Sequence, residues 1–210
     1  MLNPKGLFVT VDGPNGVGKT SVVAGVTKRL RELGREVLET LEPTNSELGK
    51  FIRQSESKYR GRTYACLIAA DRYHHLHQEV IPALKKGEVV VSARYVESSL
   101  VLQRLDDVEL DFIWELNSHV VIPDLSVILT ATPEALTQRL QKRTSLSRFE
   151  VEESRAAELA YYLEAADFLS LRAFNIMVLD NETMTLEQNV ARITKKVQSL
   201  LSNSPHGTSK

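Results

Sequence analysis

One eight-residue segment near the N-terminus constrains this chain more than any other feature. Residues 13–20, GPNGVGKT, match G-x-x-x-x-G-K-[ST] at every fixed position. They follow the apolar run 7–11 and precede residues 20–33, which have helical spacing. Glycines let successive backbone N–H groups converge on an anion, and the helix N-terminus adds partial positive charge there. The segment therefore predicts a phosphate-binding loop between a strand and a helix.

The loop predicts where a nucleoside triphosphate and its metal bind. We expect Lys19 to reach the β- and γ-phosphates of ATP, and the Thr20 hydroxyl to hold Mg²⁺. Asp12, just before the loop, is a second metal candidate that would orient the metal's water shell or the acceptor; a loop-capping role is its alternative. The residues expected to bind ATP are Gly13, Asn15, Gly16, Val17, Gly18, Lys19, Thr20, Ser21 and Arg139.

The rest of the chain alternates short β-branched runs with longer helical stretches. Strands are expected at 7–11, 36–40, 88–92, 125–130 and 175–179, and helical spacing runs through 63–86, 106–120, 151–173 and 186–201. This alternation is typical of an α/β fold whose parallel sheet is covered on both faces. Because no repeat or linker divides the chain, we predict a single domain over residues 1–202 and a flexible tail over 203–210.

Composition bears on partners and location. The formal net charge of -1 over 210 residues gives no signal for a nucleic-acid or membrane partner. No apolar run approaches the roughly 20 residues of a membrane span. The only cysteine, Cys66, suits a reducing cytoplasm, and the first residues lack the features of a signal peptide. We therefore expect a cytoplasmic protein that binds neither nucleic acid nor membrane.

Beyond the loop, four segments in order resemble the thymidylate kinase family of nucleoside monophosphate kinases. Residues 42–53 resemble its E-P-x segment and following helix, and residues 69–72 (AADR) the stretch whose arginine faces the acceptor's base. Residues 93–103 stand where the family has its D-R-Y segment, and 148–150 (RFE) resemble the end of its mobile lid. The resemblance implies a P-loop NTPase three-layer sandwich with a five-stranded parallel sheet, a lid over about 141–150, ATP, Mg²⁺ and a homodimer.

The resemblance also assigns an acceptor site. It implies that substrate is bound by Glu42, Pro43, Arg53, Ile68, Arg72, Arg94, Ser99, Leu102 and Gln103. Arg94 follows the most hydrophobic strand, at the edge where open α/β sheets place ligands, and is the best candidate to grip the acceptor phosphate. For Arg72, a surface ion pair with Asp71 or Glu79 is the alternative.

Basic residues after the helix that begins at Pro133 are expected to close over the transferring phosphoryl group. The cluster comprises Arg139, Lys142, Arg143 and Arg148. A solvated helix end is its alternative interpretation. The catalytic candidates are Lys19, Arg94, Arg143, Arg148 and Asp12. Glu158, further on, is expected on a solvated helix face.

Three positions depart from the family pattern, all on the acceptor side. Ala93 replaces the D-R-Y aspartate, Ile68 replaces a stacking phenylalanine, and Leu102 lies where the family carries an aromatic beside the deoxyribose. Asp12 or Glu42 could substitute for the lost carboxylate. The sequence predicts ATP-dependent phosphoryl transfer to a nucleoside monophosphate, with dTMP as the first choice. A different or modified nucleotide, another small phosphorylated acceptor, and a catalytically weak nucleotide-binding protein are the alternatives.

Overall fold

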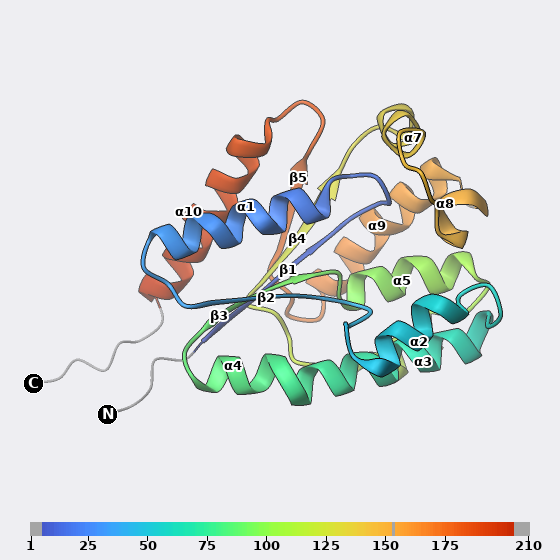
Figure 1. Cartoon of the computed structure of the whole chain (residues 1–210), viewed down its shortest axis with the longest axis horizontal. Helices are drawn as coiled ribbons and strands as arrows, with labels where there is room; N and C mark the ends of the chain where they lie inside the picture. Colours follow the sequence, from blue (N-terminus) through green and yellow to red (C-terminus); the bar gives the residue numbers. More distant parts are fainter. Residues whose placement is uncertain (1–5, 153, 204–210) are drawn as a thin grey trace, which may run out of the picture.

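A fully parallel, five-stranded sheet lies between two layers of helices (Figure 1). The computed structural model describes residues 6–152 and 154–203, except for the side chain of Glu152. The sheet order is β2-β3-β1-β4-β5, with strands β1 (Leu7–Asp12), β2 (Val37–Leu41), β3 (Val89–Ala93), β4 (Leu125–Thr130) and β5 (Ile176–Asp180). Each bound lies within one residue of its expected place. The predicted α/β fold with a five-stranded parallel sheet is confirmed.

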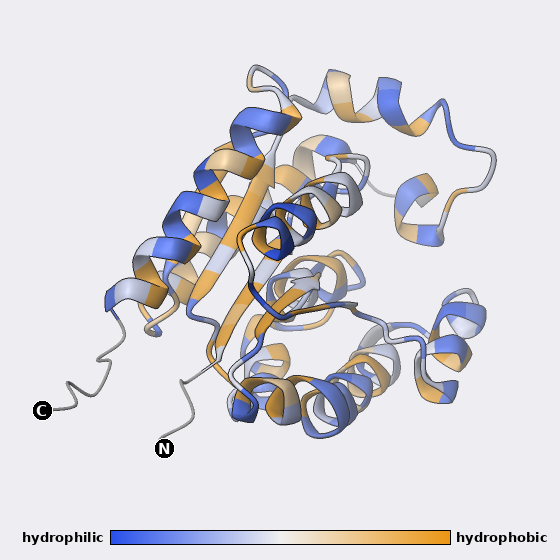
Figure 2. Ribbon diagram, turned by 60° about the vertical axis from the view of Figure 1, so that its left-hand side comes forward, coloured by the Kyte–Doolittle hydropathy of each residue, from blue (hydrophilic) through white to orange (hydrophobic). Residues whose placement is uncertain are grey.

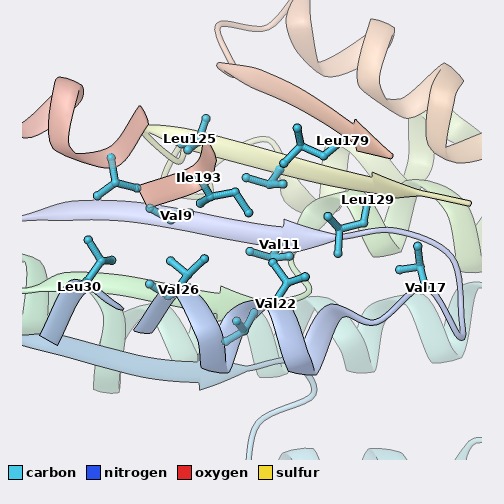
Figure 3. Close-up of a cluster of buried hydrophobic side chains, with 14 of the residues drawn as sticks. Val9, Val11, Val17, Val22, Val26, Leu30, Leu125, Leu129, Leu179 and Ile193 are labelled. Carbon is cyan, nitrogen blue, oxygen red and sulfur yellow. The ribbon is translucent and has the colours of Figure 1, made fainter. Parts of the chain in front are cut away.

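Alternation along β1 gives each face of the sheet its own core. Val9 and Val11 point to the face covered by α1 (Lys19–Glu32) and α10 (Leu186–Asn203), where Figure 3 shows them beside side chains of both helices. Phe8 points to the opposite face and belongs to the second core. Figure 2 shows the apolar strands between helices that are apolar on one side and hydrophilic on the other. This amphipathic arrangement fixes which face each helix covers.

The helices of the second layer support the acceptor side of the molecule. They are α2 (Glu47–Ser55), α3 (Gly61–His75), η1 (Leu76–Val80), α4 (Ile81–Lys85), α5 (Val96–Leu105), α6 (Leu110–Asn117) and α9 (Arg155–Ser170). Helix α7 (Pro133–Leu140) precedes the predicted lid, and α8 (Arg148–Glu152) overlaps its end. The π-helical turn η1 ends two residues before Pro82, which has no N–H to donate and so interrupts the regular helical ladder.

Helix α5 was not expected from the sequence, for a physical reason. Seven of the ten residues of α5 are buried, including Glu97, Ser98 and Ser99, and none is exposed, so no polar stripe alternates with an apolar one. A helix without an exposed face has no 3.6-residue pattern to detect. The expected helical stretches 106–120 and 151–173 are also shorter or divided, as α6 and as α8 with α9.

The described residues cover most of the predicted domain and only the first residue of the predicted tail. The part of the predicted tail from residue 204 onward lies outside the described residues. The single domain over 1–202 stays a prediction. Within the described ranges, no helix combines the length and apolar character needed to cross a bilayer.

Packing against the sheet predicts a stability contrast between two leucines. Leu30 of α1 is fully buried, whereas Leu171 is 85% exposed. We expect Leu30→Ala to lower the free energy of unfolding by about 2–5 kcal/mol, and Leu171→Ala to change it by about 0.5 kcal/mol or less. Urea unfolding of both variants measures this, and equal losses would contradict the assigned core.

Candidate active site

The phosphate-binding loop has the geometry that its sequence predicts. It leaves β1 at Asp12 and enters α1 at Lys19. Gly13 has φ +140°, and a Cβ on it would lie 2.3 Å from the carbonyl oxygen of Leu129, so only glycine fits. The loop opens onto a pocket lined by Asn15, Gly16, Gly18, Lys19, Thr20, Ser21, Leu41, Glu42, Ala93, Arg94 and Arg143, which we call the phosphate pocket. Six of the expected ATP-binding residues lie there.

The Asp12 carboxylate is the hub beneath this loop. It is fully buried and accepts five hydrogen bonds. The donors are the N–H groups of Gly13 (2.9 Å), Tyr95 (3.2 Å) and Ser98 (2.9 Å), and the hydroxyls of Ser98 (2.9 Å) and Tyr162 (2.8 Å). Five donors fill the roughly four lone-pair sites of a carboxylate. The geometry therefore supports the loop-capping role over the metal-binding role, which stays a prediction.

A second buried acid lies one layer deeper. Glu97 Oε1 accepts from the hydroxyls of Thr10 (2.7 Å) and Ser126 (2.5 Å), whereas its Oε2 has no hydrogen-bond partner among the described residues. Burial, and then the charge of Asp12, raise the pKa of Glu97 to about 7. This group lies behind the loop and does not line either pocket described here.

Lys19 is held in the loop next to another cation. Its ammonium donates to the carbonyls of Gly13 (2.6 Å) and Pro14 (3.0 Å). Burial, and then the charge of Arg94, lower the pKa of Lys19 from 10.5 to about 7. A bound anion would raise the pKa of Lys19 again, because its negative charge would stabilise the buried ammonium and offset the repulsion from Arg94.

Arg94 occupies the junction between β3 and α5. Its backbone has φ 70°, a left-handed conformation that costs a non-glycine residue energy. Its guanidinium donates to Asn15 Oδ1 (2.6 Å) and Ser98 Oγ (3.1 Å), which use two of its five N–H groups. The strained turn thus holds the planar guanidinium of Arg94, whose N–H groups match the geometry of a phosphate, against the loop.

A second cavity adjoins the phosphate pocket and collects the predicted acceptor residues. It encloses ≈ 620 Å³ of empty space, counted out to its open mouth, and we call it the acceptor cavity. All nine predicted substrate residues line it, together with Asn15, Glu56, Tyr64, Tyr95, Ser98, Ser147 and Phe149. The nine residues that the resemblance assigns to the acceptor, though scattered along the chain, therefore line one cavity. Their contacts with a substrate stay predictions.

Arg72 is locked into the wall of this cavity. It is 1% exposed and donates to Glu42 Oε2 (2.8 Å), Ser99 Oγ (2.9 Å), Asn117 Oδ1 (2.5 Å) and the Tyr95 carbonyl (2.9 Å). The expected alternative, a surface pair with Asp71 or Glu79, is wrong because the side chain points inward.

Glu42, which pairs with Arg72, is held from its other side as well. Its Oε1 lies 3.1 Å from Nδ1 of the buried His75, which contacts Thr40 through Nε2 (2.8 Å). Asp71 instead accepts from the N–H (2.7 Å) and the hydroxyl (2.7 Å) of Thr44. Arg53 donates to the carbonyls of Pro43 (2.5 Å) and Thr44 (2.7 Å), which fixes the segment that carries Glu42.

The three departures from the family pattern all lie on these walls. Ala93 lines the phosphate pocket, and Ile68 and Leu102 line the acceptor cavity. Of the two carboxylates that could substitute for the missing one, Glu42 lines both pockets. Asp12 is already saturated with donors and lines neither pocket; a substituting role for Glu42 stays a prediction.

The predicted lid residues separate into different positions. Arg143 lines the phosphate pocket and pairs with Glu150. Arg139 donates to the carbonyls of Val17 (3.3 Å) and Asn181 (2.9 Å), and so ties the loop to the segment after β5. Arg148 lines neither pocket; it pairs with Asp106. The catalytic role of Arg148 stays a prediction.

Sequence reasoning missed two residues of α9 that support the site. Glu158 was expected on a solvated face but is fully buried, accepting from the Asn15 N–H (2.9 Å) and from Arg155 (2.8 Å). Tyr162 donates to Asp12 from 150 positions away. The spacing of Glu158 and Tyr162, one helical turn apart, was the only local signal that they share a face.

Comparison with known proteins agrees with this geometry. The family model described as thymidylate kinase matches residues 11–198. A probable thymidylate kinase of Caldivirga maquilingensis is 38% identical over 148 residues, covering 69% of this chain and 72% of the relative. A probable thymidylate kinase of Pyrococcus abyssi is 33% identical over 183 residues (82% and 89%), and a thymidylate kinase of Leifsonia xyli subsp. xyli is 38% identical over 186 residues (81% and 89%).

The lowered pKa of Lys19 predicts that a bound triphosphate takes up a proton. At about pH 8 most of Lys19 is neutral in the free protein, because its pKa is about 7. A triphosphate stabilises the ammonium, so we expect uptake approaching one proton at about pH 8 and about a tenth of that at pH 6. Calorimetric titration of ATP in buffers of different ionisation enthalpy measures it.

The matched control is Lys19→Arg, whose guanidinium stays charged at both pH values. If this variant binds ATP, its binding should take up no such proton. Wild-type binding at about pH 8 without proton uptake would contradict the lowered pKa.

Proposed function

Because the chain belongs to the thymidylate kinase family, we propose that it transfers the terminal phosphoryl group of ATP to dTMP, giving dTDP and ADP. The bond from the γ-phosphorus to the bridging oxygen breaks, and an oxygen of the acceptor phosphate forms the new bond. Phosphate monoesters are already ionised near pH 7, so the attacking oxygen needs no strong general base. Positioning and charge neutralisation are what the protein must supply.

The observation that carries this proposal is the junction of the two cavities. Asn15, Glu42 and Arg94 line both of them. One cavity has the cradle of backbone N–H groups typical of a triphosphate site. The other is lined by apolar side chains together with polar groups that include the three shared residues. A nucleotide acceptor in the second cavity would therefore have its phosphate end at Arg94, facing the donor.

The charged residues divide the work of transfer. Lys19 would hold the β- and γ-phosphates, and Arg94 would grip the acceptor phosphate with the donors that Asn15 and Ser98 leave available. Arg143, at the lid edge of the phosphate pocket, would neutralise charge on the transferring group. Glu42 would face the region where Ala93 provides no carboxylate.

The residues also fit Mg²⁺. The Thr20 hydroxyl lines the phosphate pocket beside Lys19. Among the described residues, no group of three or more His, Cys, Asp or Glu side chains gathers as a protein cage for a metal. Mg²⁺ is ordinarily held by substrate phosphates, water and one or two protein oxygens, and Thr20 supplies one such oxygen. The ion would neutralise phosphate charge when bound.

Location and assembly are part of the proposal. The single cysteine and the family resemblance support a cytoplasmic, homodimeric enzyme whose one domain spans residues 1–202. Light scattering of the purified chain measures the assembly, and a monomer at micromolar concentration would contradict the dimer.

The proposed reaction predicts a ranking in a coupled ADP-release assay with Mg²⁺ and ATP. Among dTMP, dUMP, UMP, CMP, AMP and GMP, we expect the highest kcat/KM with dTMP. Lys19→Ala should lower kcat/KM on the order of 10²- to 10³-fold, because it removes a preorganised charge from the transferring phosphates. Lys28→Ala, an exposed change on the same helix, should leave turnover unchanged.

The assay also separates the alternatives that Ala93, Ile68 and Leu102 favour. Turnover with another nucleotide alone would assign the chain a different acceptor and contradict dTMP. ATP binding without turnover on the whole panel would favour a nucleotide-binding protein with weak catalysis.

A further inference from the structure

Two aromatic side chains form part of the wall of the acceptor cavity. Tyr64 of α3 and Phe149 of α8 both line the cavity, and their ring centroids lie 6.1 Å apart at 45°. They form a small apolar cluster with the buried Ile52, against which Ile68 and Leu102 pack. The lid thus contributes a side chain to the acceptor cavity as well as Arg143 to the phosphate pocket.

Tyr64 and Ile68 occupy equivalent places on successive turns of α3. Residues 64, 68 and 72 are spaced by four, so they share one face of the helix, and all three line the cavity. Burial raises the pKa of Tyr64 to about 12, so its ring carries a neutral phenol. Position 68 carries no aromatic ring, but Tyr64 supplies one a helical turn earlier, beside the ring of Phe149 from the lid.

Phe149 is held in this wall by the residue before it. The guanidinium of Arg148 makes two bonds to Asp106, at 2.6 and 3.2 Å, and its Nε donates to the Glu56 carbonyl (2.9 Å). Its backbone N–H donates to Glu56 Oε1 (2.7 Å), and its guanidinium carbon lies 4.1 Å from the centre of the Phe149 ring. Asp106 also accepts from the Gly61 N–H (2.7 Å) at the start of α3.

Through these contacts Arg148 acts as a clamp. It joins the lid to Glu56 after α2, to Asp106 after α5 and, through Asp106, to Gly61 at the start of α3. The side chains of Arg148 and Asp106 are 4% and 6% exposed, so their pairing is shielded from water. A bidentate pair of this kind fixes direction as well as distance. The clamp orients α8 and so places Phe149, whereas Arg143 at the other end of the lid stays 49% exposed.

We propose that Asp106 and Arg148 anchor the lid on the acceptor side, and that the Phe149 they position forms with Tyr64 the surface that contacts the acceptor's base. Arg148 is then a positioning residue. This inference rests on the proposed function, because it concerns the base of a nucleotide acceptor. Aromatic rings select planar bases through geometry that an aliphatic side chain cannot reproduce.

The first test separates the aromatic ring from apolar packing. Phe149→Leu keeps an apolar side chain of similar reach but removes the ring. We expect the KM for dTMP to rise about 3- to 10-fold, while the KM for ATP changes by about twofold or less. An unchanged KM for dTMP would overturn the aromatic contact.

The second test removes the anchor's charge without changing its size. Asp106→Asn should raise the KM for dTMP about tenfold or more and speed tryptic cleavage after Lys142 and Arg143, because the lid opens more often. The matched control, Glu109→Gln, breaks the exposed pair with Arg62 nearby and should change neither quantity. If Asp106→Asn lowered the unfolding midpoint but left the KM for dTMP and the cleavage rate unchanged, Asp106 would be merely structural and the anchor would be refuted.

The failure of this inference is distinguishable from failure of the proposed function. Wild-type turnover of dTMP together with unaffected Phe149→Leu and Asp106→Asn variants would leave the proposed function intact and overturn the anchor. Wild-type protein that turns over no nucleotide would overturn the proposed function, and the inference with it.

Discussion

The structure depends most on one buried carboxylate. Asp12 accepts hydrogen bonds from the phosphate loop, the turn after β3, the first turn of α5 and the middle of α9. A buried charge is tolerated only when donors replace its water, and here each donor comes from an element that lines or supports the site. Satisfying this single charge therefore fixes the loop, Arg94 and the acceptor wall relative to one another. The alternation of β1 makes this arrangement compatible with folding, because Val9 and Val11 fill one core while Asp12 faces the other side.

The site is electrostatically incomplete without an anion. Burial disfavours the charged form of Lys19, and the positive charge of Arg94 adds to that effect. Acidic groups lie behind them: burial raises the pKa of Glu158, which accepts from the backbone of Asn15. Lys19 and Arg94 thus line the phosphate pocket, whereas the carboxylates of Asp12 and Glu158 lie behind it and line neither pocket. Preorganised charges of this kind stabilise a transferring phosphoryl group without reorganisation at the moment of reaction.

Features encoded locally were predictable from the sequence, whereas those created by distant contacts were not. The loop and the five strands follow from spacing and from runs of apolar residues, and the resemblance then collected the nine acceptor residues into one cavity. Helix α5 escaped detection because burial on all sides removes its periodicity. Glu158 was misplaced because its partner, the Asn15 N–H, lies 143 positions away. The pairing of Arg148 with Asp106 also depends on tertiary structure, so neither the charge of Arg148 nor the lid resemblance of residues 148–150 could reveal it.

The cavities show which neighbouring side chains lie close to the departures at positions 93, 68 and 102. A side chain lost from a wall matters only if no neighbour reaches the same space. Glu42 reaches both pockets and is held between Arg72 and His75, so a carboxylate remains beside Ala93. Tyr64 and Phe149 bring rings to the cavity that Ile68 and Leu102 line. Because each wall is built from several elements, substitution at one element leaves the others in position to supply the same chemistry. The divergence of single motif positions is therefore compatible with the chemistry of the family, provided that the lid stays anchored where its phenylalanine completes the wall.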